Sequence, residues 1–175
     1  MVRRCSGALM PKQIANAVLF QLGWFACVLS PQHSWLLAVP LMVLGVHLSW
    51  LSSWGAEGKL LLSTLLIGVI LDSTLLHLGL FDFGQPRLLV PLWLALLWPL
   101  LASTLRLCLA WTARPWWRAS LLGATSAPLS YYAGAQLAGV TLPYGTALTL
   151  LVLALIWAVL LPLLHLLAAR LKPSP

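Results

Sequence analysis

The stretch that most constrains this chain is Leu60 to Leu80, LLLSTLLIGVILDSTLLHLGL, an apolar run that contains one acid, Asp72. At about 1.5 Å per residue, a helix of this stretch is about 31 Å long, which matches a bilayer hydrocarbon core of roughly 30 Å. An ionised aspartate near the middle of such a helix costs about 2.5 to 3.5 kcal/mol on insertion. We therefore expect a membrane-spanning helix whose Asp72 faces other helices and not lipid.

The composition extends this expectation to the whole chain. Hydrophobic residues make up 61% of the sequence and charged residues only 7%, which leaves too little polar surface for a soluble globule. Polar breaks divide the chain into six apolar runs. The sequence predicts an all-α fold, a polytopic transmembrane bundle of about six helices that forms a single domain over residues 1–175. The expected spans are about 14–29, 35–51, 60–80, 88–111, 119–137 and 146–168.

Positive charges predict the orientation of these spans, because lysines and arginines accumulate in the cytoplasmic loops of membrane proteins. With six spans, one side of the bundle receives Arg3, Arg4, Lys12, Lys59, Arg106, Arg114, Arg118, Arg170 and Lys172, and the other side receives only Arg87. Both termini are therefore expected in the cytoplasm. The formal charge of +7 then reflects the orientation of the chain in the membrane, so nucleic acid is not an expected partner.

Polar side chains at membrane depth are the candidates for chemistry, and helical rise sorts them into two levels. Asp72 and Tyr131 each lie about 18 Å from the inner end of their helices, whereas Arg106 lies roughly 10 Å closer to the cytoplasm. We therefore expect Asp72 to make a hydrogen bond with the fifth span and no ion pair with Arg106. The candidate polar cluster at the outer level is Asp72, Ser73, His77, Ser130, Tyr131, Tyr132 and Gln136. A second polar layer contains Asn16, Gln21, His47 and Arg106.

Two roles for Asp72 remain open from the sequence. It can join helices, in its neutral form donating a hydrogen bond to a tyrosine or a backbone carbonyl, or it can handle a proton or a substrate. Ser73 and His77 share a helix face that Asp72 does not, so they form no catalytic triad with it. No metal site and no cofactor are predicted, because the four histidines lie on different segments and no phosphate-binding loop occurs.

The segment Thr112 to Arg118, TARPWWR, combines two arginines with two tryptophans on the cytoplasmic side. Tryptophan and arginine favour the headgroup layer of a bilayer. The segment is thus predicted to anchor the chain at the interface, and its alternative role is a site for anionic lipid. The candidate headgroup contacts are Arg114, Trp116, Trp117 and Arg118.

Several strings of the chain are similar to those of a known family. They are Asn16 to Val28 (NAVLFQLGWFACV), Gly68 to Ser73 (GVILDS), Pro91 to Trp93 (PLW) and Pro128 to Gly134 (PLSYYAG). Over nearly its whole length the chain resembles an uncharacterised bacterial inner-membrane protein family, the domain of unknown function 2878. The resemblance implies a small multi-pass protein of a bacterial cytoplasmic membrane, and it implies no activity or catalytic residue.

The sequence favours a non-enzymatic membrane protein, either a small permease-like protein or an accessory subunit of a membrane complex. The alternative is an intramembrane enzyme acting on a lipid or isoprenoid substrate, with Asp72 as acid or base and Tyr131, Tyr132 or His77 assisting. The expected partners are membrane lipids and, for an accessory subunit, another membrane protein or a second copy of the chain.

Overall fold

The computed structural model describes residues 6–171, and within this range the chain is helical with no β-strand. The six main helices are α1 (Ser6–Leu29), α2 (Ala38–Val46), α3 (Trp54–His77), α4 (Leu92–Thr104), α5 (Trp117–Ala138) and α6 (Thr146–Arg170). Short 3₁₀ helices, η1 (Ser34–Leu37) and η3 (Ala110–Thr112), precede α2 and follow α4, and a π-helical turn, η2 (His47–Leu51), extends α2. The predicted all-α bundle of six helices is confirmed.

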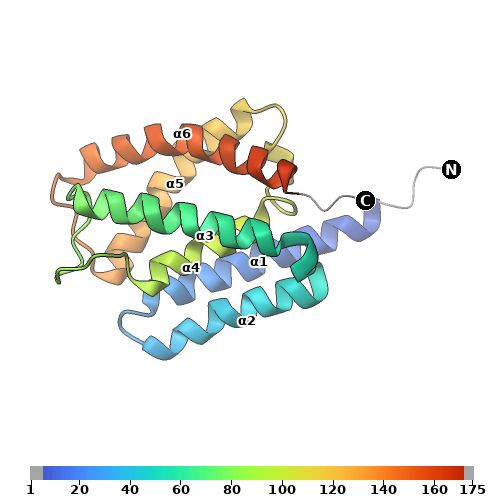
Figure 1. Cartoon of the computed structure of the whole chain (residues 1–175), viewed down its shortest axis with the longest axis horizontal. Coiled ribbons are helices and arrows are strands. Elements are labelled where there is room, and N and C mark those ends of the chain that lie inside the picture. The colour runs from blue at the N-terminus through green and yellow to red at the C-terminus, as the bar shows by residue number, and fades with distance from the viewer. Residues whose placement is uncertain (1–5, 172–175) are drawn as a thin grey trace.

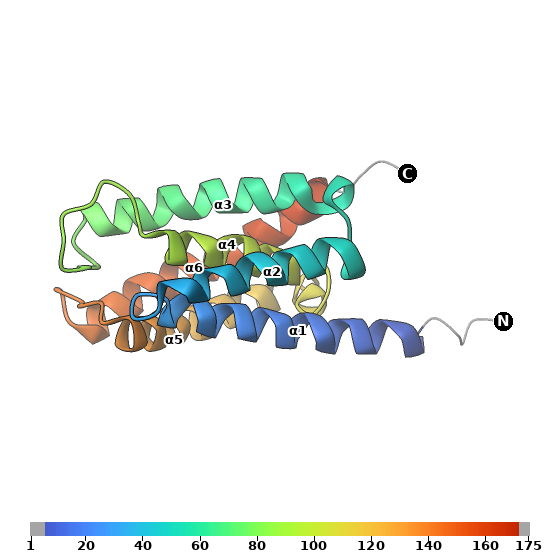
Figure 2. The ribbon, with the colours of Figure 1, turned by 90° about the horizontal axis from the view of Figure 1, so that it is seen from below.

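The helices run back and forth along one axis, so the described chain begins and ends at the same end of the bundle (Figure 1). Here α4 packs against α1, α2 and α3, while α5 and α6 form a hairpin that contacts the rest mainly through α1 and α3. Figure 2 shows α4 lying between α3 and α1. Because α5 packs mainly on α6 and not on α4, the arrangement leaves room between α4 and α5.

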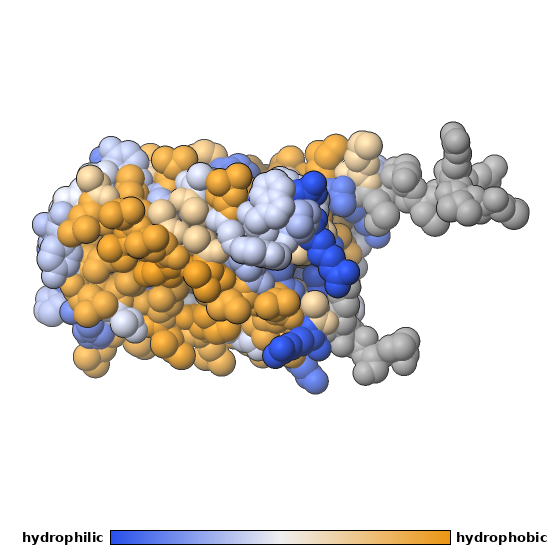
Figure 3. Space-filling model, turned by 90° about the horizontal axis from the view of Figure 1, so that it is seen from above, coloured by the Kyte–Doolittle hydropathy of each residue, from blue (hydrophilic) through white to orange (hydrophobic). Residues whose placement is uncertain are grey.

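The surface fits a membrane environment. Many large apolar side chains are exposed along the helices, and Figure 3 shows an apolar belt between two more polar ends. Four helical segments are long and apolar enough to cross a bilayer: Met10–Leu29, Ser34–Leu51, Trp54–His77 and Thr146–Arg170. The less apolar α5 and the shorter α4 complete the same bundle. A continuous exposed apolar surface of this kind requires a lipid environment or a partner.

The third helix begins earlier than the sequence predicts. Residues 52–59 were expected to form a loop, but α3 starts at Trp54, with the Ser53 hydroxyl accepting a hydrogen bond from the backbone N–H of Ala56 at 3.3 Å. This N-cap satisfies one of the free donors at the helix start. Glu57 therefore lies in the first turn of α3, where it is buried among helices and not in a solvated loop.

The fourth helix is shorter than its predicted span. Of residues 88–111, only Leu92–Thr104 form α4, and a helix of thirteen residues is about 20 Å long, too short to cross the membrane alone. Pro91 lies at its start, and irregular turns follow Thr104. Such turns are tolerated at membrane depth where protein groups satisfy the freed backbone.

Candidate functional site

Asp72 lies at the junction of α3, α4 and α5, completely buried. The indole N–H of Trp98 donates a hydrogen bond to its Oδ2 at 2.7 Å, and the hydroxyl of Tyr131 donates to its Oδ1 at 2.6 Å. The predicted hydrogen bond between Asp72 and the fifth helix is thus confirmed, with Tyr131 as the partner. Asp72 accepts both hydrogen bonds, whereas the neutral form considered from the sequence would donate one.

The sequence did not identify Trp98 as a partner of Asp72. A tryptophan in a membrane helix is commonly assigned to the interface, but Trp98 lies in the middle of α4 and is 3% exposed. A buried indole N–H needs an acceptor, and Asp72 is the acid at that depth. The ring of Trp98 also stacks on Trp157 of α6, with centroids 5.3 Å apart. Asp72 therefore fixes an aromatic group that joins α4 to α6.

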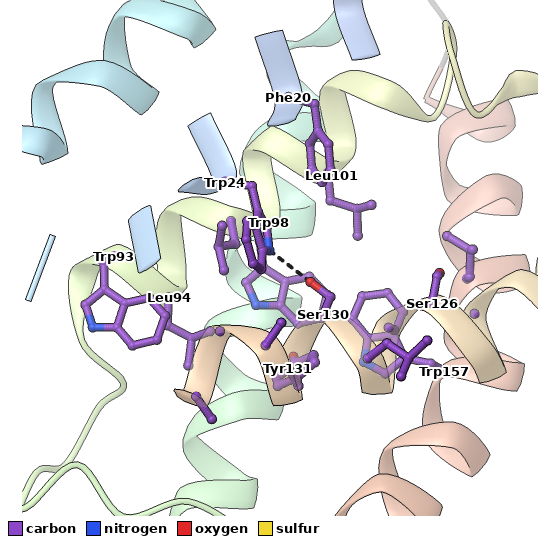
Figure 4. Close-up of a pocket in the computed structure, with 18 of the residues that line it drawn as sticks. Phe20, Trp24, Trp93, Leu94, Trp98, Leu101, Ser126, Ser130, Tyr131 and Trp157 are labelled. Carbon is purple, nitrogen blue, oxygen red and sulfur yellow. Dashed lines mark hydrogen bonds between the residues drawn. The ribbon is translucent and has the colours of Figure 1, made fainter. Parts of the chain in front are cut away.

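A cavity of about 580 Å³ lies between α4 and α5, and α1 and α6 complete its wall. Apolar side chains form most of this wall, and its aromatic residues include Trp24, Phe81, Trp93, Trp98, Tyr131 and Trp157. Figure 4 shows side chains of α4 and α5 pointing toward one another across this space. Cavities of roughly 300 to 1,000 Å³ with mainly apolar walls are typical ligand sites.

Two polar contacts shape the cavity. The indole N–H of Trp24 on α1 donates to the hydroxyl of Ser130 on α5 at 2.9 Å, as the dashed line in Figure 4 shows. At the end of the bundle away from the termini, Asp82 and Thr141 exchange two backbone hydrogen bonds of 3.0 Å. This pairing joins the α3–α4 connection to the α5–α6 connection and places Phe81 and Phe83, which flank Asp82, in the wall.

Asp72 itself does not line the cavity. Its two hydrogen-bond partners, Trp98 and Tyr131, do line it and stand between the carboxyl group and the cavity. Asp72 is therefore placed to hold two wall residues in position.

The other members of the predicted outer cluster do not gather around Asp72. Ser73 accepts a hydrogen bond from the backbone N–H of Val90 at 3.3 Å, and a ring nitrogen of His77 lies 3.0 Å from the carbonyl oxygen of Leu88, so both hold the α3–α4 connection. Ser130 instead contacts Trp24. Tyr132 and Gln136 are exposed on the outside of α5. The predicted cluster is thus wrong as a single group, because neighbouring residues on a helix face different directions.

The predicted second layer is organised around Asn16 on α1. Its side-chain nitrogen donates to the carbonyl oxygen of Ser103 at 3.2 Å and lies 3.5 Å from Nδ1 of His47. Its side-chain oxygen accepts from the backbone N–H of Cys108 at 3.4 Å. Asn16 therefore satisfies backbone groups on both sides of the point where α4 ends, which explains how this irregular segment is accommodated.

His47 also contacts Glu57, a residue that the sequence did not select. Nε2 of His47 lies 2.6 Å from Oε2 of Glu57, and both residues are buried. The contact joins the end of α2 to the start of α3. Within the described part of the chain this pair is the only salt bridge, and no three His, Cys, Asp or Glu residues form a group that could hold a metal ion.

Replacing Asn16 by leucine is expected to destabilise the protein by about 2 to 3 kcal/mol, because two buried backbone groups lose their partner. At about 2 to 4 °C per kcal/mol, the thermal midpoint in mild detergent should fall by roughly 4 to 12 °C. Gln21→Leu is the matched control, since Gln21 is exposed on the same helix and should tolerate the change. Equal midpoints for the two variants would contradict the role given to Asn16.

The remaining residues of the second layer lie apart from Asn16. Gln21 is exposed and lines the cavity, so it does not join the contacts around Asn16. Arg106 donates to the carbonyl oxygens of Ala56 at 2.6 Å and Ala168 at 2.8 Å, which ties together the start of α3 and the end of α6. Arg106 is therefore engaged at the end of the bundle that holds the termini, far along the axis from Asp72.

The candidate headgroup contacts lie at the same end of the bundle, where α5 begins. Trp116 is 70% exposed and Trp117 is 52% exposed, and Arg114 and Arg118 are exposed beside them. The guanidinium of Arg118 lies 5.8 Å from the ring centre of Trp117, and one of its nitrogens donates to the carbonyl oxygen of Arg114 at 3.5 Å. Two cations and two indoles are thus exposed within one short segment of the chain.

The helical bundle and its apolar surface define an integral membrane protein with several membrane helices. Residues 13–163 match the family described as protein of unknown function (DUF2878), and the chain belongs to this family. The family identified from the sequence strings is thereby confirmed. Comparison with the curated proteins and with the solved structures found no match.

Proposed function

We propose that this protein is a non-enzymatic component of a bacterial cytoplasmic membrane that binds a lipophilic molecule in the cavity between α4 and α5. The observation that carries the proposal is the cavity itself, with a volume of about 580 Å³ and an aromatic, mainly apolar wall. Both roles favoured by the sequence, a permease-like protein and an accessory subunit, can use such a binding step.

The chemistry of the wall favours binding over catalysis. Of the residues that the structure describes, no Asp, Glu, His, Lys or Arg lines the cavity, and Tyr131 is its one tyrosine. General acid–base catalysis needs a titratable group within hydrogen-bond reach of the substrate. Asp72 has both oxygens engaged and is completely buried, so direct proton exchange with a substrate would first require Trp98 or Tyr131 to move.

The position of the cavity favours a ligand that arrives from the bilayer. Three of its lining residues, Gln21 on α1 and Ser126 and Leu129 on α5, are exposed on the lateral surface of the helices. If the helices cross the bilayer, an opening beside these three residues faces the lipid. A hydrocarbon chain can therefore exchange between bilayer and cavity without crossing water.

The charge distribution supports a cytoplasmic position for both termini. Among the described residues, Lys12, Lys59, Arg106, Arg114, Arg118 and Arg170 lie toward the end of the bundle that holds the termini. Arg87 is the one described cation in the connections at the other end. The excess of cations on one side is the usual mark of the cytoplasmic face.

Ser126→Trp tests the proposed binding site by filling its lateral opening. The purified protein is reconstituted with a phospholipid that carries a photoreactive diazirine in the middle of its acyl chain, irradiated, and analysed by peptide mass spectrometry. The wild type should give adducts on the cavity-lining parts of α1, α4 and α5. The variant should reduce these adducts at least about fivefold, because an indole occupies the opening.

Thr125→Trp is the matched control for this experiment. Thr125 and Ser126 are both exposed, and each donates a hydrogen bond to a carbonyl oxygen four residues earlier, at 2.8 and 2.7 Å, but only Ser126 lines the cavity. Adducts on the exposed Leu41 and Met42 of α2 report ordinary lipid contact and should not change. Adducts confined to such outer surfaces in the wild type would refute the proposal.

A further inference from the structure

A row of residues on α5 connects the cavity to one end of the bundle. Leu122, Ser126, Ser130 and Gly134 line the cavity and are spaced four residues apart. Residues with this spacing are neighbours on a helix surface. Arg118 is the next position in the row, so its backbone lies about 6 Å beyond Leu122 along the helix axis. The Arg118 side chain therefore begins where the cavity-lining row of α5 ends.

The charge at this point is not neutralised within the described chain. The Arg118 guanidinium donates a hydrogen bond to the backbone carbonyl oxygen of Arg114, so it lies against the backbone that carries the second cation, and α5 begins beside them at Trp117. The positive end of the helix dipole adds to their field. The acids lie elsewhere: Glu57 contacts His47, Asp72 contacts Trp98 and Tyr131, and Asp82 belongs to the opposite end.

From this arrangement we infer that the ligand is an amphiphile with a phosphate headgroup, which binds Arg114 and Arg118 while its hydrocarbon chain extends along α5 into the cavity. The inference rests on the proposed function of the cavity and adds the headgroup class. Arginine pairs well with phosphate oxygens, and the exposed indoles of Trp116 and Trp117 suit the headgroup layer. Two cations of this kind favour an anionic over a zwitterionic headgroup by roughly tenfold or more.

The test compares two photoreactive lipids with the same diazirine acyl chain, phosphatidylglycerol and phosphatidylcholine, each as a minor component of uncharged vesicles. In the wild type, phosphatidylglycerol should give at least about fivefold more adducts on the cavity-lining peptides. The double variant Arg114→Gln/Arg118→Gln should abolish this preference. The matched control is Lys12→Gln/Arg170→Gln, which removes two exposed cations from the same end of the bundle and should keep the preference.

The outcomes separate this inference from the proposed function. Equal labelling of the cavity by both lipids would overturn the headgroup assignment and leave cavity binding intact, whereas absence of cavity labelling by either lipid would overturn both. Loss of preference in both double variants would show a general charge effect and also overturn the assignment. Competition by unlabelled phosphatidylglycerol or by a polyprenyl monophosphate then distinguishes a glycerophospholipid from an isoprenoid phosphate, each of which carries the inferred headgroup chemistry.

Discussion

Replacing Asp72 by leucine is expected to destabilise the protein by about 2 to 6 kcal/mol, because two buried donors lose their acceptor at once and each such loss costs about 1 to 3 kcal/mol. The donors are the indole N–H of Trp98 and the hydroxyl of Tyr131. At about 2 to 4 °C per kcal/mol, the thermal midpoint in mild detergent should fall by roughly 4 to 24 °C. Both donors line the cavity, so labelling of the cavity should fall as well.

Asp72→Asn is the matched variant that separates structural support from proton chemistry. The amide oxygen can accept from Trp98, and the amide nitrogen can donate to Tyr131 once the hydroxyl turns. If Asp72 holds the wall, this variant should keep the thermal midpoint within about 1 kcal/mol of the wild type and keep the cavity labelling. A stable Asp72→Asn protein that has lost the cellular phenotype of the wild type would instead support the enzymatic alternative, with Tyr131 passing a proton between Asp72 and the cavity.

The contact between Asp72 and the fifth helix could be predicted from the sequence because the depths of Asp72 and of its partner both follow from regular helix geometry. Each residue of a membrane helix advances by the same rise, so depth can be counted along α3 and α5 and compared. Tyr131 was placed at the level of Asp72 in this way, and the structure brings them to 2.6 Å. Depth alone does not give the direction of a side chain, which is why Ser130, Tyr132 and Gln136 were grouped with Tyr131 although they face elsewhere.

The early start of α3 could have been predicted from the sequence. Ser53 is a favourable N-cap, and Glu57 follows within the first turn, where an acid is stabilised by the helix dipole. The charged and small residues of the segment instead indicate a loop between two spans. Glu57 is therefore absent from the predicted site residues, although it forms the buried contact with His47.

The short α4 and the cavity could not be predicted from local patterns. Residues 88–111 are mostly apolar, and local pattern gives no reason for the helix to end at Thr104. It ends where Asn16, which lies 87 residues from Ser103 and 92 from Cys108, satisfies the backbone on both sides. The cavity arises because α5 packs on α6 and stays apart from α4. Both features depend on contacts between distant segments, and periodicity within one segment carries no information about them.

The second large effect is expected at Gly68 of α3, which lies directly against Trp98. A Cβ atom added at Gly68 would come within 1.9 to 2.2 Å of the indole ring, far closer than atoms can approach. The ring cannot move away freely, because Asp72 accepts the hydrogen bond of its N–H and Trp157 stacks on it. Gly68→Ala should therefore cost about 3 kcal/mol or more through overpacking and the weakened hydrogen bond. The thermal midpoint in detergent should fall by roughly 6 °C or more.

Gly45→Ala is the matched control, because Gly45 is also helical but an added Cβ there meets nothing within 4 Å. Alanine is the better helix former, so this variant should equal or exceed the wild type in stability. The clash itself is tested by a double-mutant cycle with Trp98→Phe. Since the smaller ring leaves room for a methyl group, Gly68→Ala should cost clearly less in the Trp98→Phe background than in the wild type. Equal costs in the two backgrounds would show that Gly68 is required for a reason other than its contact with Trp98. Such a result would contradict the close packing of α3 against the Trp98 ring.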